Sequence, residues 1–186
     1  MNTIILPENR FDEAVKFVLS HEGGLSDDKN DPGGLTKYGI SIRLLKNLNL
    51  DLNHDDIINR KDILDLTIPL AKEIYKKEWW DKYNYQSINN FIVARKIFDS
   101  AVNMGGLQAH KLVQRAINKI RKIPIEVNGS FSQKTIDDLN FIELHDESKL
   151  FLLYFRSFLK LFYESLVNVH PKLGVFLHGW LTRASE

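Results

Sequence analysis

The sequence has no cysteine among its 186 residues. That absence excludes disulfide-stabilised scaffolds, thiolate zinc sites, iron–sulfur clusters and cysteine nucleophiles. An excess of charge of one sign is missing as well, because 25 lysines and arginines oppose 24 aspartates and glutamates. A net charge of +1 provides no basic field for nonspecific nucleic-acid binding, so we expect no nucleic-acid partner.

Long uncharged hydrophobic segments are also scarce. The most apolar segment, 150–169, is long enough for a membrane span, but Arg156, Lys160 and Glu164 recur in it every four residues. These charges form a polar stripe along a helix, which favours a buried core helix and no stable membrane insertion. The N-terminus lacks a basic region followed by an apolar stretch, so we expect synthesis in the cytoplasm without a signal peptide.

Helical patterns dominate what is present. Apolar residues at helical spacing predict an amphipathic helix over 10–22, which two glycines end. Five of the ten glycines lie within 23–39, together with Asp, Asn and Pro, and predict a small β-hairpin with GGLS and GGLT as its arms. Ser41 and Thr67 are suited to cap the helices that follow. The sequence therefore predicts a mainly α fold with a small N-terminal β-hairpin after the first helix.

Three short motifs for metals or nucleotides are matched only in part. His21-Glu22 begins like a zinc-protease HExxH motif, but Leu25 stands where the second histidine belongs. A glycine-rich stretch similar to a phosphate-binding loop has Ile40 in place of its lysine. The acidic run 27–31 is not followed by the bidentate glutamate of a calcium loop. We therefore expect neither a metal ion nor a cofactor.

A glutamate, an aspartate and a threonine around the predicted hairpin form a more complete constellation. Glu22 ends the predicted helix, Asp31 follows nine residues later and Thr36 five after that. Glycoside hydrolysis needs a carboxylic acid that protonates the leaving oxygen, and a polar group that holds water or stabilises the oxocarbenium ion. The negative end of the helix dipole favours a protonated carboxyl group at Glu22. The spacing alone is equally compatible with Glu22 on the surface and with Asp31 and Thr36 shaping turns.

The run EGGLSDDKNDPGGLTKYGIS, residues 22–41, resembles the opening signature of the muramidases of glycoside hydrolase family 108. The segments 71–83, 98–105, 127–135 and 176–183 resemble later landmarks of that family, in the same order. The resemblance implies a lysozyme-like helical fold. It also implies two domains, a catalytic domain over residues 1–90 and a helical peptidoglycan-binding domain over residues 91–186 packed on it.

The same resemblance assigns roles to the constellation. It implies that Glu22 is the catalytic acid and that Asp31 and Thr36 position water or stabilise charge. In the DPGG stretch, Asp31 could also serve the turn alone. Leu25 departs from the family, which commonly has an aromatic residue there, and the change weakens a sugar-stacking contact.

Five further residues are candidates for contacts with the glycan. Tyr38, Trp79 and Trp80 could stack on sugar rings, although aromatic residues in such places are as often part of the core. Asp99 and Asn103 are candidates for hydrogen bonds to acetamido or hydroxyl groups, with pairing inside a helix bundle as the alternative for Asp99.

These residues lead to an expected activity and to two alternatives. We expect a monomeric N-acetylmuramidase, a lysozyme, that cleaves β-1,4 links between N-acetylmuramic acid and N-acetylglucosamine. The alternatives are a lytic transglycosylase, which uses the same glutamate without water, and a non-catalytic peptidoglycan-binding accessory of secretion. Action in the periplasm or cell wall then requires export, by a holin-type pore or by secretion machinery. Cell lysis and toxin or protein secretion both stay open as biological roles.

Overall fold

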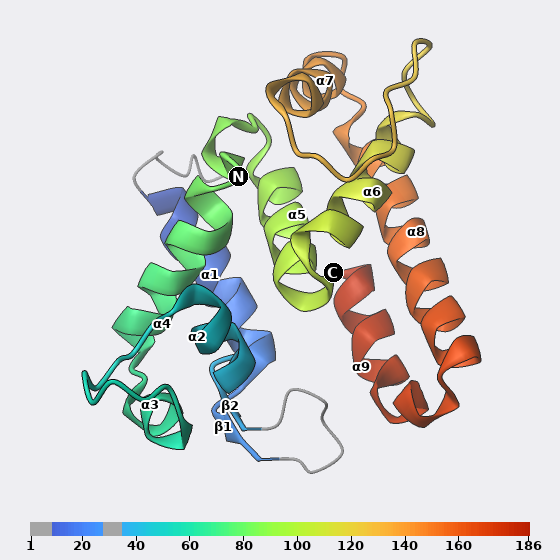
Figure 1. Cartoon of the computed structure of the whole chain (residues 1–186). Helices are drawn as coiled ribbons and strands as arrows, with labels where there is room; N and C mark the ends of the chain where they lie inside the picture. Colours follow the sequence, from blue (N-terminus) through green and yellow to red (C-terminus); the bar gives the residue numbers. More distant parts are fainter. Residues whose placement is uncertain (1–8, 28–34) are drawn as a thin grey trace. The chain divides into compact units, whose positions relative to one another are not determined.

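The computed structural model describes residues 9–27 and 35–186 (Figure 1). Its elements, in chain order, are α1 (Arg10–Glu22), β1 (Leu25–Ser26), β2 (Thr36–Lys37), β3 (Ile40–Ser41), α2 (Ile42–Leu48), α3 (Arg60–Asp65), α4 (Ile68–Tyr75), the π-helix η2 (Lys76–Asp81), the 3-10 helix η3 (Tyr85–Ser87), α5 (Phe91–Met104), α6 (Gly106–Ile117), α7 (Gln133–Leu144), α8 (Ser148–Val169), the 3-10 helix η4 (Pro171–Leu173) and α9 (Gly174–Ser185). Helices dominate, and the strands form one small antiparallel sheet. The predicted mainly α fold is confirmed.

The chain divides into two compact units. One is Phe11–Glu78, and the other is Trp79–Glu186 together with residues 9 and 10. The sequence predicted a catalytic domain over residues 1–90 and a peptidoglycan-binding domain over residues 91–186. This functional division stays a prediction.

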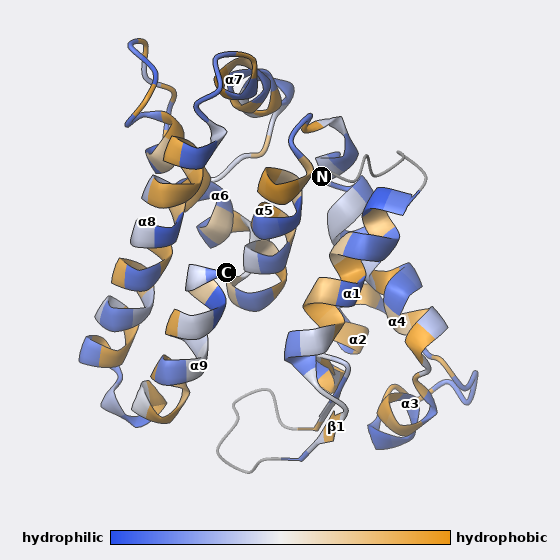
Figure 2. Ribbon diagram, turned by 180° about the vertical axis from the view of Figure 1, so that it is seen from behind, coloured by the Kyte–Doolittle hydropathy of each residue, from blue (hydrophilic) through white to orange (hydrophobic). Residues whose placement is uncertain are grey.

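The unit Phe11–Glu78 has its own hydrophobic core. The helices α1 and α4 lie side by side, and Lys72 on α4 pairs with Asp12 on α1 at 2.7 Å. In Figure 2, hydrophobic and hydrophilic residues alternate along the ribbons of both helices. The buried side chains of this core include Ala14, Val15, Val18, Leu35, Ile40, Leu45, Ile63, Leu66, Ala71 and Ile74. The core fixes the end of α1 and the sheet that follows it.

The sheet has the order β1-β2-β3. Pairing of β1 with β2 places Ser26 opposite Thr36, as expected for the GGLS and GGLT arms. The third strand, β3, was not expected. It pairs with β2 across a two-residue turn in which Tyr38 and Gly39 both have positive φ, 53° and 75°. This is the conformation of a type I′ hairpin turn, in which Asn-Gly or Asp-Gly is the usual pair, so Tyr-Gly gives little sequence signal.

The unit that contains Trp79–Glu186 is built around α8. This helix packs against α6 and α9, and its buried residues include Phe151, Leu152, Phe155, Leu159 and Tyr163. The expected core helix is therefore confirmed. Across residues 9–27 and 35–186, no helix combines the length and the apolar character that a membrane crossing requires.

The last helix of this unit is tied to α5 by buried charges. Arg183 donates two hydrogen bonds to one carboxylate oxygen of Asp99, at 3.0 and 2.8 Å. Lys96, also on α5, donates to the backbone oxygen of Arg183. Arg156 on α8 donates to the backbone oxygen of Glu186 at 2.6 Å. These contacts fix the end of α9 against α5 and α8.

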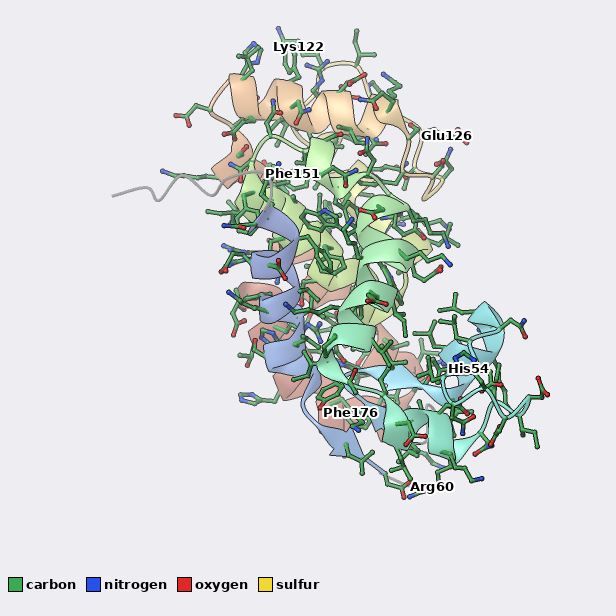
Figure 3. All side chains as sticks on the ribbon, turned by 90° about the vertical axis from the view of Figure 1, so that its left-hand side faces the viewer. His54, Arg60, Lys122, Glu126, Phe151 and Phe176 are labelled. Atoms are coloured by element: carbon green, nitrogen blue, oxygen red, sulfur yellow. The ribbon has the colours of Figure 1, made fainter. Side chains whose placement is uncertain are left out.

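One glutamine holds residues 128–130 of the loop between α6 and α7. The side chain of Gln114 donates to the side-chain oxygen of Asn128 and to the backbone oxygen of Ser130, and it accepts from the backbone N–H of Gly129 at 2.8 Å. Asn128 in turn donates to Glu126, which projects from the loop in Figure 3. The loop thus keeps its shape without forming regular secondary structure.

Candidate functional site

Glu22 is the last residue of α1 and is partly exposed. Gly23, at a φ of +69°, ends the helix as the two-glycine signal predicts. The carboxyl group of Glu22 lies against the β2–β3 turn. A Cβ placed on Gly39 would stand 2.6 Å from its Oε2 and 2.8 Å from its Cδ. The sheet therefore brings the backbone of the turn into direct contact with the predicted acid.

The hydroxyl group of Tyr75 reaches the same point. Its oxygen lies 2.6 Å from the position of a Cβ on Gly39, so the phenol and the Glu22 carboxyl are neighbours. Tyr75 ends α4, is 1% exposed and donates a hydrogen bond to the backbone oxygen of Tyr38 at 2.8 Å. Three elements thus meet at Gly39: the end of α1, the end of α4 and the β2–β3 turn.

The other members of the predicted constellation are placed only in part. Thr36 is the first residue of β2, is partly exposed and stands opposite Ser26 and Ser41 in the sheet. Asp31 lies outside the described residues. The side chain of Tyr38 is partly exposed in the turn, with the ammonium group of Lys37 5.7 Å from its ring centre.

The remaining candidates belong to the second unit, and two of them are core residues. Trp80 is 3% exposed and packs edge-on against Tyr85 and Phe98, with ring centres 6.1 and 5.5 Å away. It offers no open ring face to a sugar. Asp99 is 1% exposed, and its carboxylate is held by Arg183. The burial and contacts favour the alternative that the sequence left open for each residue: Trp80 packs in the core and Asp99 anchors α9.

Trp79 and Asn103 keep part of their surface accessible. The indole N–H of Trp79 donates to the backbone oxygen of Ala101 at 3.2 Å. The side-chain oxygen of Asn103 accepts from the hydroxyl group of Tyr163 at 2.6 Å. Contacts of Tyr38, Trp79 and Asn103 with a glycan stay predictions.

Sequence reasoning missed Gly39 and Tyr75. Tyr75 lies within the segment 71–83, but a tyrosine on the apolar side of a helix is typical of a core residue. Gly39 was counted among the turn glycines, and its closeness to Glu22 depends on the packing of α1 against the sheet. One signal in the sequence could have indicated the turn at Gly39. The pair Tyr38-Gly39 is followed by β-branched Ile40, which is compatible with a tight hairpin.

The loop before α3 has several of the acidic residues of a calcium-binding loop. Positions 1, 3, 5 and 12 of a calcium-loop pattern are occupied by Asp51, Asn53, Asp55 and Asp62, a match that was not among the predictions from the sequence. Asp51 accepts from the backbone N–H groups of His54 and Asp56, and Figure 3 labels His54 in this loop. Within residues 9–27 and 35–186, no group of three or more His, Cys, Asp or Glu side chains is arranged to hold a metal ion.

Comparison with known proteins bears directly on the part of the chain that contains Glu22, Gly39 and Tyr75. Residues 15–105 match the family model Glycosyl hydrolase 108. The match supports the resemblance that the sequence indicates for this part of the chain. The Glycosyl hydrolase 108 segment includes the whole sheet and α4, and it continues through α5.

A solved structure has the same fold over almost the whole chain. The structure of Brucella abortus SagA has a TM-score of 0.71, with 21% sequence identity, and the match covers 96% of this chain and 91% of SagA. It confirms the lysozyme-like mainly α fold beyond the Glycosyl hydrolase 108 segment. A search of curated proteins gave no match.

Proposed function

We propose that this protein is a peptidoglycan hydrolase, an N-acetylmuramidase that cleaves β-1,4 links between N-acetylmuramic acid and N-acetylglucosamine with Glu22 as general acid. The observation that carries the proposal is the Glu22 carboxyl seated against Gly39 and Tyr75, within a segment that matches Glycosyl hydrolase 108. A glycoside hydrolase of this kind needs a carboxyl group held in one place, because proton transfer to the leaving oxygen requires hydrogen-bond reach.

The second group of the reaction is proposed to come from the sheet region. A water molecule or the developing positive charge at the anomeric carbon needs a polar partner on the other side of the sugar. Thr36 on β2 and Asp31 are the candidates. If Asp31 has this role, Asp31→Asn should reduce turnover severely at an unchanged melting temperature, because asparagine has nearly the same size and shape as aspartate but carries no charge. Full activity of Asp31→Asn would leave the role to Thr36 and a water molecule.

Glu22→Gln tests the acid. The amide keeps the shape of the side chain but delivers no proton, so cleavage of purified sacculi should fall by about 100-fold to 10,000-fold. Glu13→Gln is the matched control, since Glu13 is an exposed carboxylate on the same helix, paired with Lys16. Normal activity of a folded Glu22→Gln protein would contradict the assignment.

The released fragments distinguish the proposal from its two alternatives. Mass spectrometry of digested sacculi should find reducing muramic ends. Anhydro ends would indicate a lytic transglycosylase, and an absence of fragments would indicate a non-catalytic binding protein. The proposed substrate lies in the periplasm or cell wall, so export by a holin-type pore or by secretion machinery is part of the proposal.

A further inference from the structure

We propose that Tyr75 is a positioning residue for Glu22, with Gly39 as the spacer that brings the two side chains together. The inference rests on the proposed function and adds to it a second side chain that controls the acid. The hydroxyl oxygen of Tyr75 and Oε2 of Glu22 each lie 2.6 Å from the same point, the place of a Cβ on Gly39. Tyr75 is buried, at 1% exposure, and therefore has a fixed position.

The direction of the hydrogen bond made by Tyr75 gives this contact its chemistry. A phenol carries one proton, and Tyr75 donates it to the backbone oxygen of Tyr38 at 2.8 Å. Toward another neighbour its oxygen can then only accept. A carboxyl group can donate only while it is protonated, and that is the form a general acid needs. The phenol therefore fits the protonated form of Glu22 and limits the rotation of its carboxyl group.

Gly39 makes this approach possible for two reasons. A Cβ at this position would be closer to the carboxyl and phenol oxygens than non-bonded contacts allow. The backbone also has a φ of +75°, in the left-handed region that glycine adopts most readily. A side chain at position 39 would strain the turn and push Glu22 and Tyr75 apart.

Tyr75→Phe tests the positioning role, because it removes the hydroxyl group and keeps the buried ring. On purified sacculi we expect turnover to fall roughly 100-fold, the loss that a displacement of about 1 Å can cause, while the half-saturating concentration of sacculi stays the same. Tyr85→Phe is the matched control, since Tyr85 is an equally buried tyrosine in the other unit. Wild-type turnover in both variants, with only a lower melting temperature, would overturn the inference.

A pair of glycine variants tests the spacer. Gly39→Ala and Gly23→Ala both place alanine at a positive φ, but nothing lies within 4 Å of a Cβ on Gly23. Both variants carry the backbone strain, and only Gly39→Ala also displaces Glu22 and Tyr75. We expect Gly39→Ala to lose turnover as Tyr75→Phe does and Gly23→Ala to keep most of it. Equal turnover in the two variants would overturn the inference, and the pair decides the matter if Tyr75→Phe does not fold.

Glu22→Gln separates this inference from the proposed function. An inactive Glu22→Gln protein with a fully active Tyr75→Phe protein refutes only the positioning role. An active Glu22→Gln protein refutes the acid itself, and the role of Tyr75 falls with it.

Discussion

Acid should destabilise the unit that contains Trp79–Glu186 through one buried histidine, His110. Its side chain is 1% exposed, and its Nε2 lies 2.7 Å from the hydroxyl oxygen of Tyr85. Burial lowers the pKa of His110 from 6.5 to about 4, although a hydrogen bond with the backbone of Gly129 opposes the shift. Burial also raises the pKa of Tyr85 well above its usual value, so the phenol keeps its proton.

The size and sign of the effect follow from these pKa values. Between pH 6.5 and 4 the unfolded chain binds a proton at His110 that the folded protein does not, so acid favours unfolding. One pKa unit corresponds to about 1.4 kcal/mol, and the shift therefore amounts to a loss of about 3 kcal/mol in the free energy of unfolding by pH 4. The stabilisation is complete above pH 6.5. Such a loss is a large part of the stability of an ordinary domain.

Urea unfolding followed by tryptophan fluorescence measures this loss. Trp79, Trp80 and Trp180 are the three tryptophans of the chain, and all belong to the unit that contains His110. His110→Phe should be less stable at pH 7, because Tyr85 loses its partner, but it should lose about 3 kcal/mol less than the wild type on going to pH 4.

The control is His178→Asn, which removes an exposed histidine from the same unit and should keep the wild-type dependence on pH. Parallel stability curves for the wild type and His110→Phe would refute the reasoning.

Three further outcomes are expected. Burial lowers the pKa of Lys96 from 10.5 to about 8. Because only the unfolded chain keeps this proton between pH 8 and 10.5, the free energy of unfolding should rise with pH over that range. Urea unfolding of Lys96→Met should not show this rise. Asp62→Ala should lose about 1–3 kcal/mol in thermal unfolding, because the buried carboxylate accepts from the N–H groups of Leu52 and Asn59. Cleavage of sacculi should survive EDTA, since acid chemistry at Glu22 needs no metal; a loss that calcium restores would contradict this and direct attention to the loop 51–62.

Local signals in the sequence predicted much of the fold. Ser41 and Thr67 cap α2 and α4 by accepting from the N–H groups of Leu44 and Leu70, as their hydroxyl groups led us to expect. Such caps depend on residues three apart in sequence. The strand β3 was missed because Tyr38 adopts a positive φ that a tyrosine rarely favours, and neighbouring residues give little indication of it.

The candidate site was less accessible to sequence reasoning. Glu22 could be placed at the end of a helix because the stop signal is adjacent to it. Its neighbour Tyr75 comes from a distant part of the sequence, and only the packing of α1, α4 and the sheet brings the two together. The choice between a glycan contact and a core role for Trp80 and Asp99 was open for a related reason: the type of a residue does not reveal whether Phe98 or Arg183 already covers it.

The hold of Gln114 on the loop between α6 and α7 has a consequence for chemical ageing. In an Asn-Gly pair such as Asn128-Gly129, the glycine nitrogen can attack the side-chain carbonyl carbon of the asparagine and expel ammonia. Water then opens the resulting succinimide to aspartate or isoaspartate. Here Gln114 engages both partners, accepting from the N–H of Gly129 and donating to the oxygen of Asn128. During storage, Gln114→Leu protein should therefore deamidate faster at Asn128 than the wild type. Peptide mass spectrometry measures the two rates, and equal rates would mean that the hydrogen bonds of Gln114 give no protection. The shelf life of the protein would then depend on a side chain that takes no part in the proposed reaction.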